Sequence, residues 1–295
     1  MFSRLFPRRR TFFAIFPAIL LGALTFAARR AAASTITWGG IQWNVKSGTE
    51  MGPGPNVWSA DNVFVDGSGD LHLAITNAGG TWTCAEVSTG ATYGFGTYQW
   101  QVTTSVANLD PNVVLGLFVY GPLALGPDGT HEIDVEYARF GSADADSGRW
   151  TNWPNVLATP SLTARSSYPL ALAGVPGTTS RFSWRATEIA FSTLAGFQPA
   201  GSNSNTIQSW TYRPADPGTT ISQAAMPVHM NLWLYEGAPP TDGRGVEVVI
   251  HSFNFAASSS AVPALPRSGL VLLLAASAAI GLVALKRRVS VSRGG

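Results

Sequence analysis

The chain has 295 residues, a length at which a single all-β domain with a large core is ordinary. Its 31 glycines, 19 prolines and 10 tryptophans favour a turn-rich β protein. A lone cysteine, Cys84, excludes an intrachain disulfide. We expect its thiol to be a buried, small apolar group rather than a nucleophile.

The formal net charge of +2 is misleading, because many of the basic residues are concentrated at the two ends of the chain. Residues 34–258 hold eight of the 19 basic residues and all 17 acidic ones, so this central part carries a net charge of −9. An acidic domain lacks the positive surface that binds nucleic acid or anionic lipid. The same charge favours a neutral polysaccharide over a strongly sulfated or uronic one as a partner.

The first 33 residues have the pattern of an export signal. Four arginines within residues 4–10 precede an apolar run at 12–28, and three alanines at 31–33 offer a small-residue cleavage site. The Arg9-Arg10 pair is loosely similar to a twin-arginine signal, so the twin-arginine and general export routes both stay open. An uncleaved anchor is the alternative, but the apolar run is short for a membrane span. We predict that residues 34–257 form an exported domain.

From residue 34 onward, strand-like runs recur at short intervals and are separated by turn signals rich in Gly, Pro, Asn and Asp. The predicted strands are 35–38, 41–45, 62–65, 71–75, 85–88, 96–102, 113–120, 132–136, 180–185, 188–192, 228–234 and 246–253. Residues 51–56 are predicted to be a loop, and 180–185 with 188–192 a hairpin. No segment has helical periodicity and no segment repeats. Two packed antiparallel sheets are therefore the expected architecture.

The segment Glu132-Ile133-Asp134-Val135-Glu136 alternates acidic and apolar residues. Because a strand sends alternate side chains to opposite faces, the three carboxyls would share one face, with the two apolar residues in the core. Three carboxylates on one face repel each other, and stability does not require them. A site that attacks with one carboxyl and protonates with another does. The spacing alone leaves open an edge strand whose acidic face is merely solvated.

Five segments, in this order, resemble glycoside hydrolase family 16, the group of laminarinases, lichenases, agarases and xyloglucan transferases. They are 85–88, 93–98, 116–121, 132–136 and 230–233, and the resemblance covers roughly residues 38–257. It implies a concanavalin A-like jelly-roll β-sandwich of two antiparallel sheets, with a glycan cleft across one of them.

The resemblance also implies roles for individual residues. Glu132 would be the nucleophile, Glu136 the general acid/base, and Asp134 the residue that tunes both. The residues that would contact the sugar are Glu86, Tyr120, Asn231 and Trp233. For Glu86 the alternative is a surface acid of a strand, and for Trp233 it is a core tryptophan.

Three further residues lie beside the acidic segment. Trp150 and Trp153 follow it in a stretch flanked by Gly, Asn and Pro, which we predict to be a loop at the rim of the cleft. His131 precedes it and would point to the opposite face from Glu132, as a packed or hydrogen-bonded neighbour.

The resulting prediction is an exported, endo-acting β-glycan hydrolase that acts on a neutral polysaccharide such as a β-glucan and needs no organic cofactor. Retention of configuration is implied by the family alone, because residues i and i+4 of a flat strand lie about 13 Å apart, whereas a retaining pair needs about 5 Å. A non-catalytic glycan-binding or matrix protein and a transglycosylase are the alternatives. The three intact carboxyls favour an enzyme over a binding protein.

Some family members hold a structural Ca²⁺, and the sequence indicates no place for it here. Two positions depart from the family pattern. Thr130 stands where lichenases have tryptophan, and Ser88 stands where many members have arginine. Both positions concern substrate contacts, so they leave the substrate open.

The C-terminal part resembles the PEP-CTERM class of bacterial sorting tails. Residues 258–268 form a linker with the motif Val-Pro-Ala-Leu-Pro, seventeen uncharged residues follow at 269–285, and Lys286-Arg287-Arg288 comes directly after them. A helix of that length reaches about 25 Å, at the lower edge of a membrane span. We predict that residues 269–295 are a C-terminal transmembrane or sorting tail, held in the membrane by its apolar helix, and that the folded part faces outward. Processing by a sorting protease and simple anchoring both stay open.

Overall fold

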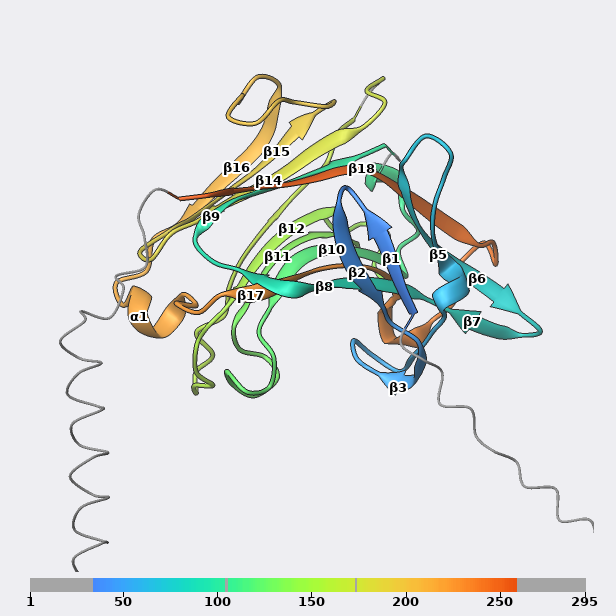
Figure 1. Cartoon of the computed structure of the whole chain (residues 1–295), viewed down its shortest axis with the longest axis horizontal. Helices are drawn as coiled ribbons and strands as arrows, with labels where there is room; N and C mark the ends of the chain where they lie inside the picture. The colour runs from blue at the N-terminus through green and yellow to red at the C-terminus, as the bar shows by residue number, and fades with distance from the viewer. Residues whose placement is uncertain (1–33, 104–105, 173, 259–295) are drawn as a thin grey trace, which may run out of the picture. The chain divides into compact units, whose positions relative to one another are not determined.

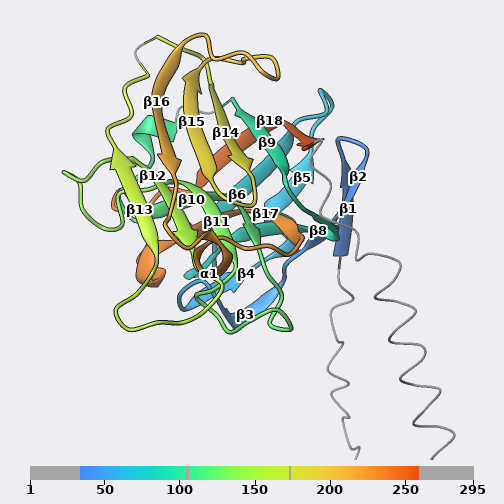
Figure 2. The same ribbon diagram turned by 90° about the vertical axis from the view of Figure 1, so that its left-hand side faces the viewer.

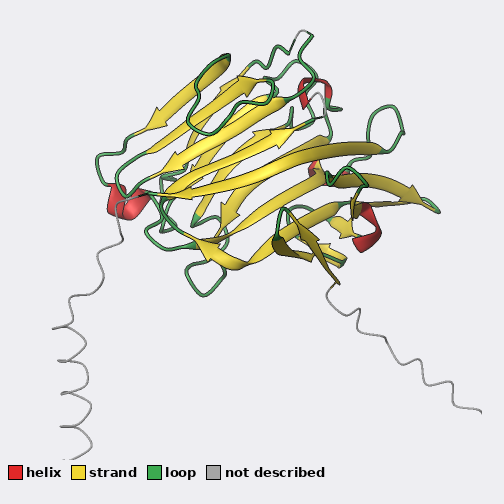
Figure 3. Ribbon diagram, turned by 45° about the horizontal axis from the view of Figure 1, so that its top comes forward, coloured by secondary structure: helices red, strands yellow, loops and turns green. Residues whose placement is uncertain are grey.

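The computed structural model describes residues 34–103, 106–172 and 174–258 (Figure 1). The predicted export signal and the predicted C-terminal tail lie outside these residues, and both remain predictions. Within the described part of the chain, no helix is long and apolar enough to cross a membrane. Strands make up most of the regular structure (Figure 3), and the α-helix found among the described residues is the four-residue α1 (Pro217–Thr220).

Two large antiparallel sheets lie one above the other (Figure 1). The first sheet has the strand order β1 (Ser34–Trp38), β2 (Ile41–Val45), β8 (Ala85–Tyr93), β17 (Met226–Leu234), β10 (Val113–Tyr120), β11 (Glu132–Tyr137), β12 (Gly148–Trp153) and β13 (Ala164–Tyr168). The second sheet has the order β16 (Thr206–Tyr212), β15 (Ile189–Ala195), β14 (Thr178–Trp184), β9 (Gly96–Val102), β18 (Val246–Ala257), β6 (Leu71–Ala78) and β5 (Val63–Val65), and β7 (Thr81–Thr83) pairs with β6. The turned view shows the start of this order across the upper layer (Figure 2).

Smaller elements complete the described structure. The strands β3 (Gly48–Met51) and β4 (Asn56–Trp58) pair with each other, and three 3-10 turns, η1 (Ala60–Asn62), η2 (Val106–Asn108) and η3 (Tyr235–Gly237), lie in connections. The expected all-β sandwich of two antiparallel sheets is therefore confirmed.

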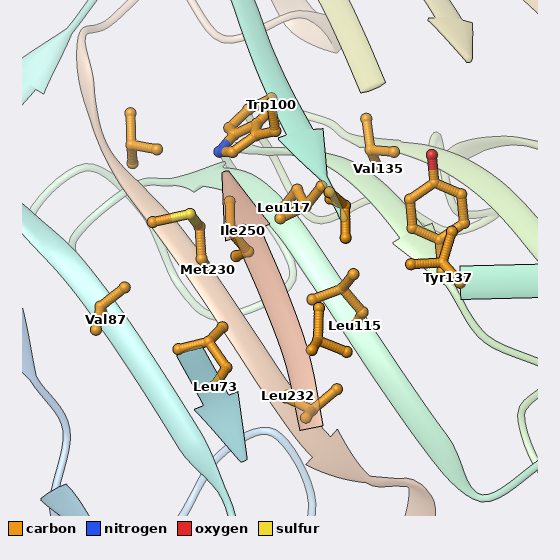
Figure 4. Packing of buried hydrophobic residues seen from close by; sticks show 14 of the residues in the cluster. Leu73, Val87, Trp100, Leu115, Leu117, Val135, Tyr137, Met230, Leu232 and Ile250 are labelled. Atoms are coloured by element: carbon orange, nitrogen blue, oxygen red, sulfur yellow. The ribbon is translucent and has the colours of Figure 1, made fainter. Parts of the chain in front are cut away.

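The core lies between the two sheets (Figure 4) and is built mainly from alternate side chains of the strands. On β11 the side chains of Ile133, Val135 and Tyr137 are fully buried, as the sequence pattern predicts for the first two. Residues of β10 and β17 pack beside them from the same sheet. The second sheet contributes Trp100 from β9 and residues of β6 and β18 (Figure 4). The hydroxyl of Tyr137 reaches across to Ser180 Oγ at 2.6 Å and so satisfies its polar end inside the core.

All twelve predicted strands are present, and the predicted hairpin is confirmed by the pairing of β14 with β15. Cys84 is fully buried, and burial raises the pKa of its thiol to about 11, so it is an inert core group as expected.

The sequence prediction failed for segments that lack a continuous apolar pattern. The strands β3, β4, β7, β12, β13 and β16 were not predicted, whereas the predicted loop 51–56 is confirmed at residues 52–55, which connect β3 to β4. Polar residues and glycine fill these segments, and their strand conformation comes from hydrogen bonding to neighbouring strands rather than from their own composition.

Gly148, the first residue of β12, is expected to tolerate no side chain. A Cβ at this position would lie against the ring of Tyr168, which is buried, stacks on Trp150 at a centroid distance of 4.2 Å and is hydrogen-bonded to Thr193. Gly148→Ala should therefore lower the free energy of unfolding by about 1–3 kcal/mol, the usual cost of overpacking. Denaturant titration measures this loss. Gly67→Ala is the matched control, because nothing lies within 4 Å of its Cβ, and it should change stability little. An equal effect of the two substitutions would contradict the prediction.

Candidate active site

The three acidic side chains of β11 share the outer face of the first sheet, opposite the core. Each faces defined neighbours on β10 and β12: Glu132 lies between Tyr120 and Trp153, Asp134 between Phe118 and Thr151, and Glu136 between Gly116 and Arg149. β11 is a central strand, so the alternative of a solvated edge strand is wrong.

The outer face continues across the neighbouring strands in rows of paired residues, which we call the carboxylate face. Its first row is Ser167, Arg149, Glu136, Gly116, Asn231 and Glu86; its second is Arg165, Thr151, Asp134, Phe118, His229, Ser88 and Asn44; its third is Trp153, Glu132 and Tyr120. At a strand spacing of about 4.8 Å, Glu86 lies roughly 14 Å from Glu136 along the first row. The face is therefore long enough to bind an extended ligand across the strands.

The carboxyls are held by hydrogen bonds from β12. Trp153 Nε1 donates to Asp134 Oδ2 at 2.9 Å, and Thr151 Oγ1 donates to Glu136 Oε2 at 3.2 Å. Asp134 is buried, and its other oxygen, Oδ1, has no hydrogen-bond partner among the described residues. A buried oxygen without a partner is costly, and a proton shared with the neighbouring Glu132 carboxyl would remove that cost.

Burial is the main cause of the unusual protonation of these acids. It raises the pKa of Glu132 to about 8, with a further contribution from the charge of Glu136. Burial and the charges of both glutamates raise the pKa of Asp134 well above its usual value. The interaction between Glu132 and Asp134 raises the pKa of Asp134 and lowers that of Glu132. We therefore place the shared proton on Asp134, so that Glu132 is the carboxyl of the pair that ionises first as pH rises.

Glu136 is tuned differently. Burial raises its pKa, but the positive charges of Arg149 and Arg165 and the hydrogen bond from Thr151 oppose the increase. The site thus combines an aspartate that keeps its proton, the neighbouring Glu132 with a pKa raised to about 8, and Glu136, whose raised pKa is opposed by two positive charges. Acids whose pKa values are separated by their surroundings are what general acid and nucleophilic catalysis require.

The raised pKa of Glu132 predicts that a neutral side chain at this position stabilises the fold at high pH but not at low pH. A carboxyl whose pKa is higher in the folded state favours folding at low pH, and this contribution is lost as pH rises from about 4 to about 8. Glu132→Gln should therefore raise the Tm by about 3 °C or more at pH 8 and change it little at pH 4. Thermal unfolding at both pH values measures the difference. Glu236→Gln, at an exposed glutamate, is the control. A Tm gain that is equal at both pH values would contradict the assignment.

Glu86 is not the surface acid of the alternative interpretation. It is buried on β8, where Lys46 Nζ donates to its Oε2 at 2.8 Å and His229 Nδ1 lies 3.2 Å from its Oε1. Burial raises the pKa of the carboxyl, but the hydrogen bond with His229 and the charge of Lys46 outweigh it, and the pKa is lowered. Glu86 is thus a fixed anion at one end of the first row. Its neighbour Asn231 is also buried, and Asn231 Oδ1 lacks a hydrogen-bond partner among the described residues.

The aromatic candidates lie in different settings. Tyr120 is half-buried beside Glu132 and donates its hydroxyl hydrogen to Asp128 Oδ1 at 3.1 Å. Trp233 is half-buried on the same face of β17 as Asn231, as a sugar-contacting residue would be. It also packs against the core, as the alternative of a core tryptophan implies. Trp153 belongs to strand β12, not to a loop.

Trp150 corrects the prediction that both tryptophans line a rim. It lies on β12 with its side chain on the core face, is fully buried and stacks on Tyr168. The two tryptophans are three residues apart, so on a strand they must point to opposite faces. His131, as predicted, is a packed neighbour: it is buried, and its Nδ1 is hydrogen-bonded to Ser222 at 3.0 Å.

Sequence reasoning missed several residues of the carboxylate face, namely Phe118, Arg149, Thr151, Arg165 and His229, and it also missed Lys46, which forms an ion pair with Glu86. His229 stacks on Phe118 at a centroid distance of 5.1 Å and could have been found by alternation from Asn231. The residues of β12 and β13 could not, because those strands were not predicted. Among the described residues, no group of three or more His, Cys, Asp or Glu side chains could hold a metal ion.

The fold is similar to that of solved β-glucanases. A β-glucanase from Bacillus licheniformis superimposes with a TM-score of 0.55 and 19% identity, covering 76% of this chain and 95% of that chain. A lichenase from a mouse hindgut metagenome has a TM-score of 0.53 and 18% identity, covering 73% and 93%. A glycoside hydrolase family 16 endo-glucanase from Bacteroides ovatus has a TM-score of 0.55 and 12% identity, covering 75% and 97%.

The sequence matches no protein-family model and no curated protein. At these identities the structural likeness shows the fold alone. The described part of the chain has the jelly-roll β-sandwich fold of the family 16 glycoside hydrolases.

Proposed function

We propose that the chain is an exported, endo-acting β-glycan hydrolase that retains anomeric configuration through a double displacement. The observation that carries the proposal is the set of three carboxyls on one face of β11, with a buried Asp134 whose Oδ1 lacks a hydrogen-bond partner among the described residues. The likeness of the fold to β-glucanases supports the same chemistry.

In the first step Glu132 attacks the anomeric carbon while Glu136 donates its proton to the leaving glycosidic oxygen. A glycosyl ester on Glu132 results, and the new chain end departs. In the second step Glu136, now ionised, takes a proton from water, and the water oxygen displaces Glu132 from the anomeric carbon. Asp134 keeps its proton, stabilises the Glu132 carboxylate between the steps and is itself positioned by Trp153 Nε1.

The remaining predicted residues are proposed to bind the sugar chain. Asn231 would donate hydrogen bonds to sugar hydroxyls or accept them, and the fixed anion Glu86 would accept them, along the first row. Tyr120, Trp153 and Trp233 would supply apolar ring faces for pyranose rings. The substrate that we propose is a β-glucan or a related polysaccharide with a neutral main chain. The enzyme would act on it outside the cell, with its C-terminal tail in contact with the membrane.

The test is incubation of the purified chain and its Glu132→Gln variant with a panel of β-glucans and galactans. We expect new reducing ends from one polymer with the wild type and none with the variant, and NMR should show that the first product has the anomeric configuration of the substrate. Transfer products formed at high acceptor concentration would indicate a transglycosylase instead. If neither protein cleaves any polymer but both are retarded by one in affinity electrophoresis, the face is a binding surface and the hydrolase proposal fails.

A further inference from the structure

Two arginines lie side by side on the carboxylate face, on the strands beyond the carboxyls. Arg149 of β12 pairs with Glu136 on one side and with Ser167 on the other, and Arg165 of β13 pairs with Thr151 in the next row. β13 is the edge strand of the first sheet (Figure 2), and both Arg165 and Ser167 are exposed. Arg149 is thus the direct neighbour of Glu136, and Arg165 lies one strand farther from the carboxyls, in the row of Asp134.

Neither of these arginines forms an ion pair with a described residue, as is also true of Arg139, Arg181 and Arg244. Among the described residues, neither has a carboxylate within 4.0 Å, whereas Lys46 pairs with Glu86, and Arg185 and Arg213 both pair with Glu188. The central part of the chain has 17 acidic residues and eight basic ones. Acids are therefore in excess, so the absence of an ion pair at these two arginines, which lie on neighbouring strands of one face, is not due to a shortage of carboxylates.

Aromatic rings hold both guanidinium groups in place. The Arg149 guanidinium carbon lies 3.8 Å from the ring centroid of Phe140, and that of Arg165 lies 4.9 Å from the ring of Trp153. Stacking on a ring uses the flat face of the guanidinium and leaves its N–H edge directed elsewhere. Arg149 Nε also donates to Ser167 Oγ over a long 3.4 Å. An arginine ordered in this way loses less entropy when it binds a planar or tetrahedral anion.

We propose that Arg149, Arg165 and Ser167 form a subsite for an acidic group, either a carboxylate or a sulfate ester, on the sugar bound beside Glu136. The inference rests on the proposed function and narrows its substrate to a β-glycan whose neutral main chain carries acidic substituents. The overall charge of −9 favours a neutral polymer, but the field at a subsite depends on the nearest charges, and here those include two arginines.

A second interpretation is that the arginines only adjust the acidity of Glu136. That role changes the pH profile of cleavage on every polymer, whereas an anion subsite changes the preference between neutral and charged polymers. The two interpretations therefore predict different measurements.

The experiment uses the full chain with Glu132→Gln, so that binding is measured without cleavage. The probes are one neutral β-glucan, its carboxymethyl derivative and its sulfate derivative, matched in length, and the readout is retardation in affinity electrophoresis. We expect at least one charged derivative to bind about tenfold more tightly than the neutral polymer, as one or two charge-assisted hydrogen bonds would give. The preferred derivative distinguishes a carboxylate from a sulfate subsite. Arg165→Gln and Arg149→Gln should each reduce the ratio of charged to neutral affinity toward one.

Arg244→Gln is the matched control, because Arg244 is exposed and lies in the connection before β18, away from the carboxylate face. It should leave the ratio unchanged. The proposal is overturned if neither charged derivative binds more tightly than the neutral polymer, or if the preference survives both arginine substitutions. If the active chain cleaves the neutral polymer but its Glu132→Gln variant binds neither charged derivative, the subsite proposal is wrong and the hydrolase proposal is still supported. If a charged derivative binds more tightly than the neutral polymer, this preference depends on the arginines, and the active chain cleaves no polymer, the subsite proposal is supported and the hydrolase proposal is wrong.

Discussion

Glu132→Ala is expected to lower kcat about 10⁴-fold or more, and added azide should restore turnover with a glycosyl azide of inverted configuration. The substitution removes the attacking carboxylate and opens a small space beside the anomeric carbon. Azide can enter that space and attack the anomeric carbon from the side on which the Glu132 carboxylate would have attacked. Because no second displacement follows, the glycosyl azide has the anomeric configuration opposite to that of the substrate. Product analysis by NMR measures the outcome directly.

Glu136→Ala should behave differently, because it removes the proton donor and not the nucleophile. We expect a loss of about 10²–10⁴-fold, smaller for substrates with a good leaving group, since those need less protonation. Azide should then attack the glycosyl ester on Glu132 and give a product of retained configuration. Circular dichroism spectra matching the wild type are the control for both variants. If the two azide products have the opposite configurations, the roles of Glu132 and Glu136 must be exchanged.

The second large effect concerns the two tryptophans of β12. Trp150→Ala should lower the free energy of unfolding by about 3–5 kcal/mol, because its indole is fully buried and packs between the rings of Tyr168 and Phe191, at centroid distances of 4.2 Å and 5.8 Å. A loss of this size is a large part of the stability of an ordinary domain. Denaturant unfolding measures it, and Trp150→Phe should recover part of the loss by filling most of the space.

Trp153→Ala is the comparison within the same strand. Its indole is half-buried on the carboxylate face and supplies the hydrogen bond to Asp134, so we expect about 1 kcal/mol or less of stability loss and a larger fractional loss of activity. An equal stability cost for both tryptophans would contradict the assignment of Trp150 to the core and Trp153 to the outer face.

The sequence by itself determined the features that depend on one strand. Acidic and apolar residues alternate from Glu132 to Glu136, and because the side-chain period of a strand is two, their separation into an outer face and a core face follows without knowledge of the neighbours. The same reasoning predicted most strands and the sandwich of antiparallel sheets. The family resemblance named Glu86 and Asn231, but no local pattern relates them to the acidic strand.

The tertiary structure decided which strands lie next to β11. Glu86, Asn231 and Glu136 meet in one row because the sheet order is β8, β17, β10 and β11, an order that differs from the order along the chain. Residues 148–153, Gly-Arg-Trp-Thr-Asn-Trp, have too little apolar alternation to predict a strand, and they become one only by pairing with β11 and β13. That pairing buries Trp150 and brings Arg149, Thr151 and Trp153 to the carboxyls. Long-range register is a property of the assembled sheet, and for this reason the surroundings that set the pKa values of the site could not be predicted from the acidic segment alone.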